Sequence, residues 1–139
     1  MKKYVKIFSA LSDENRLRIY LLLLQGELCV CELINTLDME QSRISHSLRI
    51  LKEAELVNNQ RRGKWMIYSI NQDLKSNKIV QGLKKELKLS SQDLSNLEKC
   101  KKENIKKYQQ ELLETAFTLI PVAGVPAFAI FLAAWQQAR

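Results

Sequence analysis

The hydrophobic positions between residues 27 and 51 form two short helical stripes, with a polar break at residues 38–40. Apolar residues recur at steps of three and four on both sides of the break, as on the buried face of an amphipathic helix. These residues are Leu33, Ile34 and Leu37, then Ile44, Leu48 and Leu51. Two such helices joined by a tight turn are typical of a helix-turn-helix.

The outer side of the second helix carries small polar and basic side chains. They are Gln41, Ser42, Arg43, Ser45, His46 and Arg49. Amides, hydroxyls and guanidinium groups are the side chains that contact base edges and phosphates. We therefore predict that this helix enters a major groove of DNA. His46 is the single histidine of the chain, and its position favours a DNA contact over a metal ligand.

A β-hairpin is predicted after the second helix. Residues 55–58 begin a strand, residues 60–64 form the turn, and residues 65–70 alternate as the returning strand. The tip carries three cations, Arg61, Arg62 and Lys64. Next to a helix-turn-helix, such a wing is expected to reach a phosphate backbone or a minor groove. The alternative is an ordinary solvated turn.

Two helices are predicted before residue 27. The first has a stripe that either packs on a partner subunit or covers the core of its own chain. Ser12 is expected to cap the second helix, and Gly26 to end it in the left-handed conformation. The stripe of the first helix is Tyr4, Ile7, Phe8 and Leu11, and the buried face of the second is Leu17, Tyr20, Leu21 and Leu24.

The span from Leu11 to Ile70 resembles the ArsR/SmtB family of metal-responsive winged-helix repressors. The matching segments are ALSDENRLRI at residues 10–19, ELCVCEL at 27–33, QSRISHSL at 41–48 and RRGKWMIYSI at 61–70. The resemblance implies a homodimer that binds a palindromic operator in double-stranded DNA and releases it when metal binds. The family commonly has SRHL where residues 45–48 read SHSL, so the resemblance does not define the operator sequence.

Cys29 and Cys31 lie within the ELCVCEL segment, which is similar to the thiolate box of arsenic- and cadmium-type members. In a regular helix, residues i and i+2 point about 200° apart. Two thiolates at this spacing bind one ion only if Cys29 lies in the loop and Cys31 in the first helical turn. Thiolates select soft or borderline ions, here As(III) or Sb(III), alternatively Cd(II), Pb(II) or Zn(II).

Cys100 is the only other cysteine. It is expected to complete a three-sulfur site for As(III) or Sb(III), either within one subunit or across a dimer. Another reading is that the cysteines are buried and inert. The chain would then be a winged-helix regulator that responds to a different signal.

The composition narrows the choice of partner and compartment. The 139 residues carry a net charge of +7, which favours a polyanionic partner such as nucleic acid. Three cysteines make no disulfide framework, and no secretory signal is recognised, so we expect a cytoplasmic protein. The sequence contains no nucleophile–base pair, acid pair or phosphate-binding glycine loop, which argues against an enzyme.

The predicted fold class is mainly α with a small β-wing, a winged helix-turn-helix followed by C-terminal helices. Residues 1–88 form the DNA-binding domain, residues 89–115 a basic amphipathic helix, and residues 116–139 an apolar segment. The long helix runs from about Ser91 to Thr118, with Ser90 as its cap and Asp93 three residues later. Residues 116–135 are uncharged and approach the length of a membrane span. Pro121, Gly124 and Pro126 interrupt them, so membrane association and a packed helical hairpin both remain open.

Overall fold

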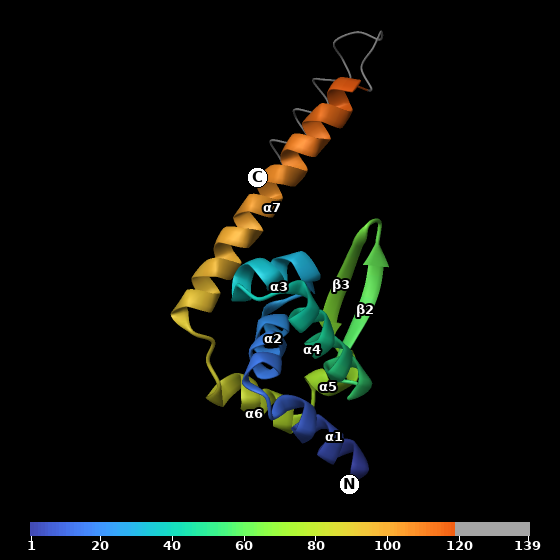
Figure 1. The fold of residues 1–139 in the computed structure, drawn as a ribbon, viewed down its shortest axis with the longest axis vertical. Helices are drawn as coiled ribbons and strands as arrows, with labels where there is room; N and C mark the ends of the chain where they lie inside the picture. The colour runs from blue at the N-terminus through green and yellow to red at the C-terminus, as the bar shows by residue number, and fades with distance from the viewer. Residues whose placement is uncertain (119–139) are drawn as a thin grey trace. The chain divides into compact units, whose positions relative to one another are not determined.

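The computed structural model describes the backbone of residues 1–118 and the side chains of residues 1–114. The chain divides into two compact units, residues 1–102 and 103–139. The elements in Figure 1 are α1 (Lys2–Leu11), α2 (Glu14–Gln25), β1 (Leu28–Cys29), α3 (Val30–Leu37), α4 (Gln41–Glu53), β2 (Val57–Arg62), β3 (Trp65–Ile70), α5 (Gln72–Lys75), α6 (Lys78–Glu86) and α7 (Ser91–Thr118). Helices predominate and the sheet is small, as predicted.

The core of the first unit is built around α2. Its residues Ile19, Tyr20 and Leu22 are fully buried. They belong to one hydrophobic cluster with the inner faces of α3 and α4, namely Leu33, Leu37, Ile44, Leu48 and Leu51. The two predicted stripes therefore do meet in a common core, which fixes which side of α4 faces outward.

The start and end of α2 differ from the prediction. Asp13, rather than Ser12, caps the helix, because its Oδ1 accepts the Arg16 N–H at 3.0 Å. Ser12 instead ends α1, where its hydroxyl donates to the Ser9 carbonyl at 2.7 Å. Gly26 has φ 155° and ψ 175°, which is not the left-handed helical conformation but is still a region that favours glycine.

The helix-turn-helix itself agrees with the sequence prediction. α3 ends at Leu37, and Asp38 adopts the left-handed conformation with φ 52° and ψ 50°. After two more residues α4 begins at Gln41. This short turn sets the two helices of the motif against each other, with Ile44 and Leu48 fully buried between them and α2.

The wing is part of a three-stranded antiparallel sheet with the order β1-β3-β2. The predicted turn at residues 60–64 was too long, since Arg62 pairs with Trp65 and only two residues connect the strands. Gly63 has φ 60°, a left-handed value that glycine adopts without strain. The predicted strand start was also early, because Glu55, with φ 59°, belongs to the turn that follows α4.

The strand β1 was missed by the sequence analysis. Leu28 pairs with Tyr68 and Cys29 with Ile67. A two-residue strand is too short to produce an alternating pattern, so it leaves no periodic signal. It matters for function because it joins the wing strand β3 directly to the start of α3.

The beginning of α7 packs against the first unit. Ser90 caps it as predicted, with its Oγ accepting the Asp93 N–H at 3.1 Å. Asn96 donates from Nδ2 to the Thr36 carbonyl of α3 at 3.1 Å, and Leu97 is buried in the core. The apolar segment 116–135 lies almost entirely outside the described residues. Within those residues, no helix is both long and apolar enough to cross a membrane.

Candidate thiol site and nucleic-acid interface

Cys29 is both the last residue of β1 and the N-cap of α3. Its backbone is extended, with φ −83° and ψ 165°, and its Sγ accepts the Glu32 N–H at 3.4 Å. Cys31 follows in the first turn of the helix. This is the placement that two cysteines at i and i+2 need in order to converge, although Cys29 lies in a strand instead of a loop.

The structure joins Cys29 and Cys31 in a disulfide, with their Cα atoms 5.5 Å apart. Cys29 is buried, whereas Cys31 is half-buried. The bridge links the end of β1, and through it the wing sheet, to the first turn of α3. A change in the bonding of the two sulfurs therefore affects both the wing sheet and the first turn of α3.

Glu32 and Cys29 cap each other at the start of α3. The Cys29 sulfur accepts the Glu32 N–H. In return, a hydrogen bond from the Cys29 backbone and the nearby charge of Lys101 both lower the Glu32 pKa, but burial dominates and raises it above its ordinary value. The pair has the reciprocal arrangement of a capping box, with a thiol in place of the usual hydroxyl.

The part of α7 that carries Cys100 runs beside α3. Asn96 of α7 bonds to Thr36 near the end of α3, and Lys101 interacts with Glu32 at its start. The two helices therefore run in opposite directions past each other. Cys100 is one turn beyond Asn96, on the same side of α7, and only 5% exposed. No three His, Cys, Asp or Glu side chains among the described residues are already grouped to hold a metal ion.

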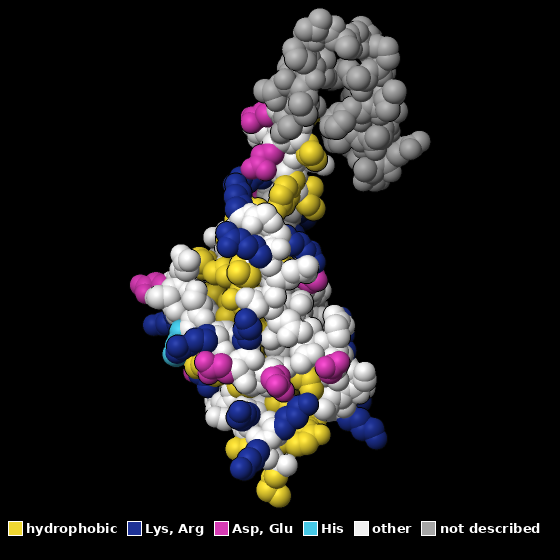
Figure 2. Space-filling model, turned by 90° about the vertical axis from the view of Figure 1, so that its right-hand side faces the viewer, with side chains coloured by type: hydrophobic (Ala, Val, Ile, Leu, Met, Phe, Trp, Pro, Cys, Tyr) yellow, Lys and Arg dark blue, Asp and Glu magenta, His cyan; other side chains and the backbone are white. Residues whose placement is uncertain are grey.

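The outer face of α4 carries the side chains that were predicted to read DNA. All six are exposed: Gln41, Ser42, Arg43, Ser45, His46 and Arg49. Arg49 Nη2 lies 3.2 Å from His46 Nδ1. Figure 2 shows the histidine, in cyan, beside Lys and Arg side chains on the surface of the molecule. Because Ile44 and Leu48 anchor the opposite face, α4 presents these polar groups on a rigid support.

The three cations at the wing tip are exposed but do not have equal surroundings. Arg62 forms an ion pair with Glu27, with Nη1 and Oε2 3.0 Å apart. Lys64 Nζ lies 5.2 Å from the centre of the Trp65 ring. Arg61 donates from Nε to the Gly63 carbonyl at 3.3 Å. No sequence pattern predicts Glu27 as the partner of Arg62, because the pairing of β1 with β3 brings it there.

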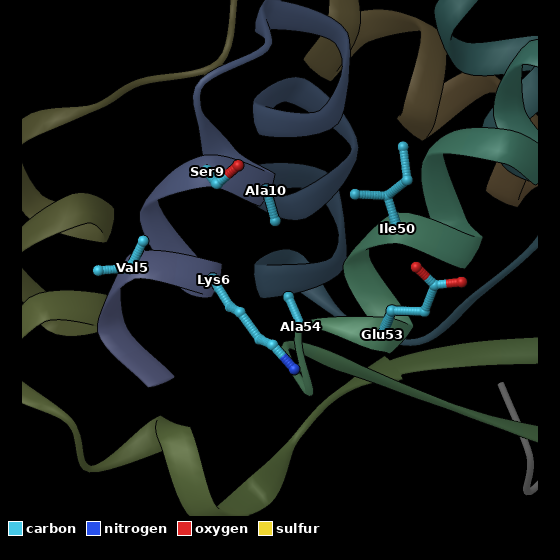
Figure 3. Close-up of a pocket in the computed structure, with 7 residues that line it drawn as sticks. All are labelled: Val5, Lys6, Ser9, Ala10, Ile50, Glu53 and Ala54. Carbon is cyan, nitrogen blue, oxygen red and sulfur yellow. The ribbon is translucent and has the colours of Figure 1, made fainter. Parts of the chain in front are cut away.

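α1 serves as cover for the core and also leaves an apolar face exposed. Ile7, Ala10 and Leu11 are buried, whereas Tyr4 and Phe8 of the predicted stripe are 45% and 54% exposed. A pocket of about 320 Å³ lies between α1 and the end of α4, and Tyr4 and Phe8 do not line it. In Figure 3 its wall is formed by α1 on one side and the end of α4 on the other, with Lys6 and Glu53 at opposite sides.

Comparison with known proteins identifies relatives for the winged-helix part of the chain. The family described as "Bacterial regulatory protein, arsR family" matches residues 13–59. The arsenical resistance operon repressor of Escherichia coli is 44% identical over 68 residues, which cover 48% of this chain and 58% of the relative. The arsenical resistance operon repressor of Bacillus subtilis is 38% identical over 74 residues, covering 52% of this chain and 70% of the relative. The match thus spans less than two thirds of the Escherichia coli protein.

A solved structure confirms the fold class. It is the homodimeric winged helix-turn-helix DNA-binding domain of a possible ArsR-family transcriptional regulator from Mycobacterium bovis. The two chains are 29% identical with a TM-score of 0.54, and the similarity covers 61% of this chain and 81% of the other. The predicted winged helix-turn-helix is therefore correct.

Proposed function

The chain belongs to the arsR family of bacterial regulatory proteins, and from that membership we propose that it is a transcriptional repressor released from its operator by a soft metal or metalloid. Its family is one of regulators and not of enzymes. The observation that carries the proposal is the convergence of the Cys29 and Cys31 sulfurs at the start of α3. That helix supports α4, which carries the exposed DNA-reading side chains.

For DNA binding, α4 enters the major groove and the wing contacts the backbone. Gln41, Ser42, Arg43, Ser45, His46 and Arg49 read bases and phosphates, and Arg61, Arg62 and Lys64 add contacts from the wing. A palindromic operator requires two copies of α4, and hence a homodimer. The exposed side chains Tyr4, Val5 and Phe8 of α1 offer an apolar surface for that partner copy, and Val5 also lines the pocket in Figure 3.

The effector site uses the reduced cysteines. Cys29 and Cys31 supply two thiolates, and Cys100 reaches them from α7 to give three sulfur ligands within one subunit. Three sulfurs suit As(III) or Sb(III), which we propose as inducers. Cd(II), Pb(II) or Zn(II) are the alternative inducers, of which four-coordinate Cd(II) and Zn(II) need a further ligand.

The switch acts through the N-cap of α3. When the Cys29 sulfur moves to bind the inducer, it no longer lies where it accepts the Glu32 N–H, so the first turn of α3 loses a cap. Leu33 and Leu37 transmit the change to Ile44 and Leu48, with which they share the core. The two α4 helices of the dimer then no longer match successive major grooves. A coupling of about 1–3 kcal/mol weakens DNA binding roughly 5- to 150-fold.

The experiment measures DNA affinity by fluorescence anisotropy with and without As(III). Its probe is a duplex that the protein itself selects from a random-sequence pool. Reduced wild-type protein should release the duplex when As(III) is added, whereas Cys31→Ser should bind it normally and stay bound. If wild-type affinity does not change with As(III), Sb(III), Cd(II), Pb(II) or Zn(II), the cysteines are inert and the regulator answers another signal.

A further inference from the structure

We propose that the Cys29–Cys31 pair is a reversible oxidation site. In its disulfide form the regulator stays bound to DNA and cannot bind As(III). The inference rests on the proposed function, because it describes how that same site is regulated. It starts from the disulfide itself, which sequence analysis did not predict.

The local geometry favours oxidation within the pair. The Cα separation of 5.5 Å lies within the usual range for disulfides, so the fold brings the two cysteines together without requiring the backbone to move. Cys31 is half-buried and is the sulfur that an oxidant in solution reaches first. Cys29 is buried directly beside it, in the position of a resolving thiol. Cys100, although buried nearby on α7, is outside the bridge.

The oxidant we name is a hydroperoxide. The Cys31 thiolate attacks the peroxide oxygen, forming a sulfenic acid and releasing hydroxide. The Cys29 thiolate then attacks the Cys31 sulfur and expels the hydroxyl group, which leaves as water after taking up a proton. Two thiols and one hydrogen peroxide thus give one disulfide and two waters. A dithiol such as dithiothreitol reverses the change by thiol–disulfide exchange.

The oxidised state keeps the DNA-binding elements intact. With the disulfide closed, Cys29 still accepts the Glu32 N–H, and α3 is helical from Val30 onward. The residues that support α4, Ile44 and Leu48, remain fully buried. The same sulfurs share their electrons in the S–S bond and are no longer thiolates, so they offer no ligand pair to As(III). Oxidation therefore separates the two properties: DNA binding persists and the metalloid response is lost.

The test uses the full-length chain, reduced or treated with a small excess of hydrogen peroxide. Thiol titration should fall from the three cysteines of the sequence to one, and peptide mapping should find the bond between Cys29 and Cys31. Bound As(III) is measured by elemental analysis after gel filtration, and DNA affinity by anisotropy with the selected duplex. Cys31→Ser is the variant that cannot form the bridge. Cys100→Ser retains the pair but lacks the proposed third ligand, so it is compared with the wild type for bridge formation alone.

We expect oxidised wild-type protein to bind the duplex within about twofold of the reduced protein, to bind no As(III), and to recover its As(III) response with dithiothreitol. A peroxide product without the Cys29–Cys31 bond overturns the inference. So does an oxidised protein that leaves the DNA unaided, or one that still takes up As(III). The measurements on reduced protein test the proposed function separately. If the DNA affinity of reduced wild-type protein changes with none of the ions, the proposed metalloid sensor is wrong, whatever the oxidised protein does.

Discussion

Arg18 of α2 and Asp93 of α7, 75 residues apart in the sequence, form a two-pronged ion pair. Arg18 donates from Nη2 to Asp93 Oδ1 at 2.8 Å and from Nε to Oδ2 at 3.2 Å. The hydrogen bonds to Asp93 raise the Arg18 pKa further above its already high value. Because Asp93 is 4% exposed, this pair holds the first turns of α7 to the central helix α2.

Replacing Asp93 by alanine should therefore loosen α7. The variant removes a charge-assisted pair of hydrogen bonds and leaves the Arg18 guanidinium without its partner. We expect the free energy of unfolding to fall by about 2–3 kcal/mol in urea titrations. Glu98→Ala on the same helix is the matched control, because Glu98 is exposed and its loss should cost no more than about 0.5 kcal/mol. Equal effects of the two substitutions would argue against the clamp.

The Tyr20 hydroxyl makes a second prediction about stability. It is buried and has no hydrogen-bond partner among the described residues. Removing an unsatisfied buried polar group without changing the shape of the ring is favourable. Tyr20→Phe should thus raise the free energy of unfolding by about 1 kcal/mol at neutral pH. Tyr108→Phe, at a position 53% exposed, serves as control and should change nothing measurable.

The same tyrosine predicts a pH dependence. Burial raises the Tyr20 pKa to about 12, above its value of about 10 in the unfolded chain. The unfolded state therefore loses its proton first as the pH rises. The stability that Tyr20 contributes is fully present below about pH 10 and is lost as the pH approaches 12. Unfolding curves at increasing alkaline pH should show a smaller loss of stability for Tyr20→Phe than for the wild type; an identical loss would contradict the assignment.

The ion pair at the wing makes a prediction about DNA binding. Replacing Arg62 and Lys64 by alanine should weaken binding and reduce the salt dependence by about one unit of slope for each phosphate contact that the substitution removes. Glu27→Gln should have the opposite effect, since it releases Arg62 from its partner and removes a negative charge near the DNA. DNA affinity measured over a series of salt concentrations tests the double variant and Glu27→Gln, with Lys84→Ala on α6 as the control. An unchanged slope in the double variant would exclude Arg62 and Lys64 as phosphate contacts.

The parts of the fold that were predicted correctly are those with a long or strongly marked pattern. Ile44, Leu48 and Leu51 recur at helical spacing, so the inner and outer faces of α4 could be assigned from the sequence alone. α7 was recognised from its cap, because Ser90 and Asp93 have the spacing that a capping pair needs. These signals are local, and tertiary contacts did not override them.

The features that were missed depend on contacts between distant segments. The position of Glu27 beside Arg62 follows from the pairing of β1 with β3. A strand of two residues leaves no recognisable pattern in the sequence. The docking of the start of α7, through Asn96 to α3 and through Asp93 to α2, likewise depends on contacts between distant segments. The convergence of Cys29 and Cys31 was anticipated with Cys29 outside the helix, but the bridge between them was not, because thiols stay reduced in the compartment that the sequence suggests.

Two substitutions of Cys29 distinguish the loss of a metalloid ligand from the loss of the N-cap of α3. Serine is a preferred N-cap residue and alanine is a poor one, with a typical difference of about 1 kcal/mol. Cys29→Ser therefore removes a metalloid ligand but retains an oxygen that accepts the Glu32 N–H, whereas Cys29→Ala removes both. We expect Cys29→Ser to bind the selected duplex as the wild type does and to ignore As(III).

Cys29→Ala should also ignore As(III), but it should bind the duplex more weakly even without an inducer, because the first turn of α3 has lost its cap in the same way that the inducer removes it. The weakening should approach, without exceeding, that of the As(III)-bound wild type. Anisotropy on both variants, together with helix content by circular dichroism, checks this. If both variants bind DNA equally well, the cap does not carry the signal.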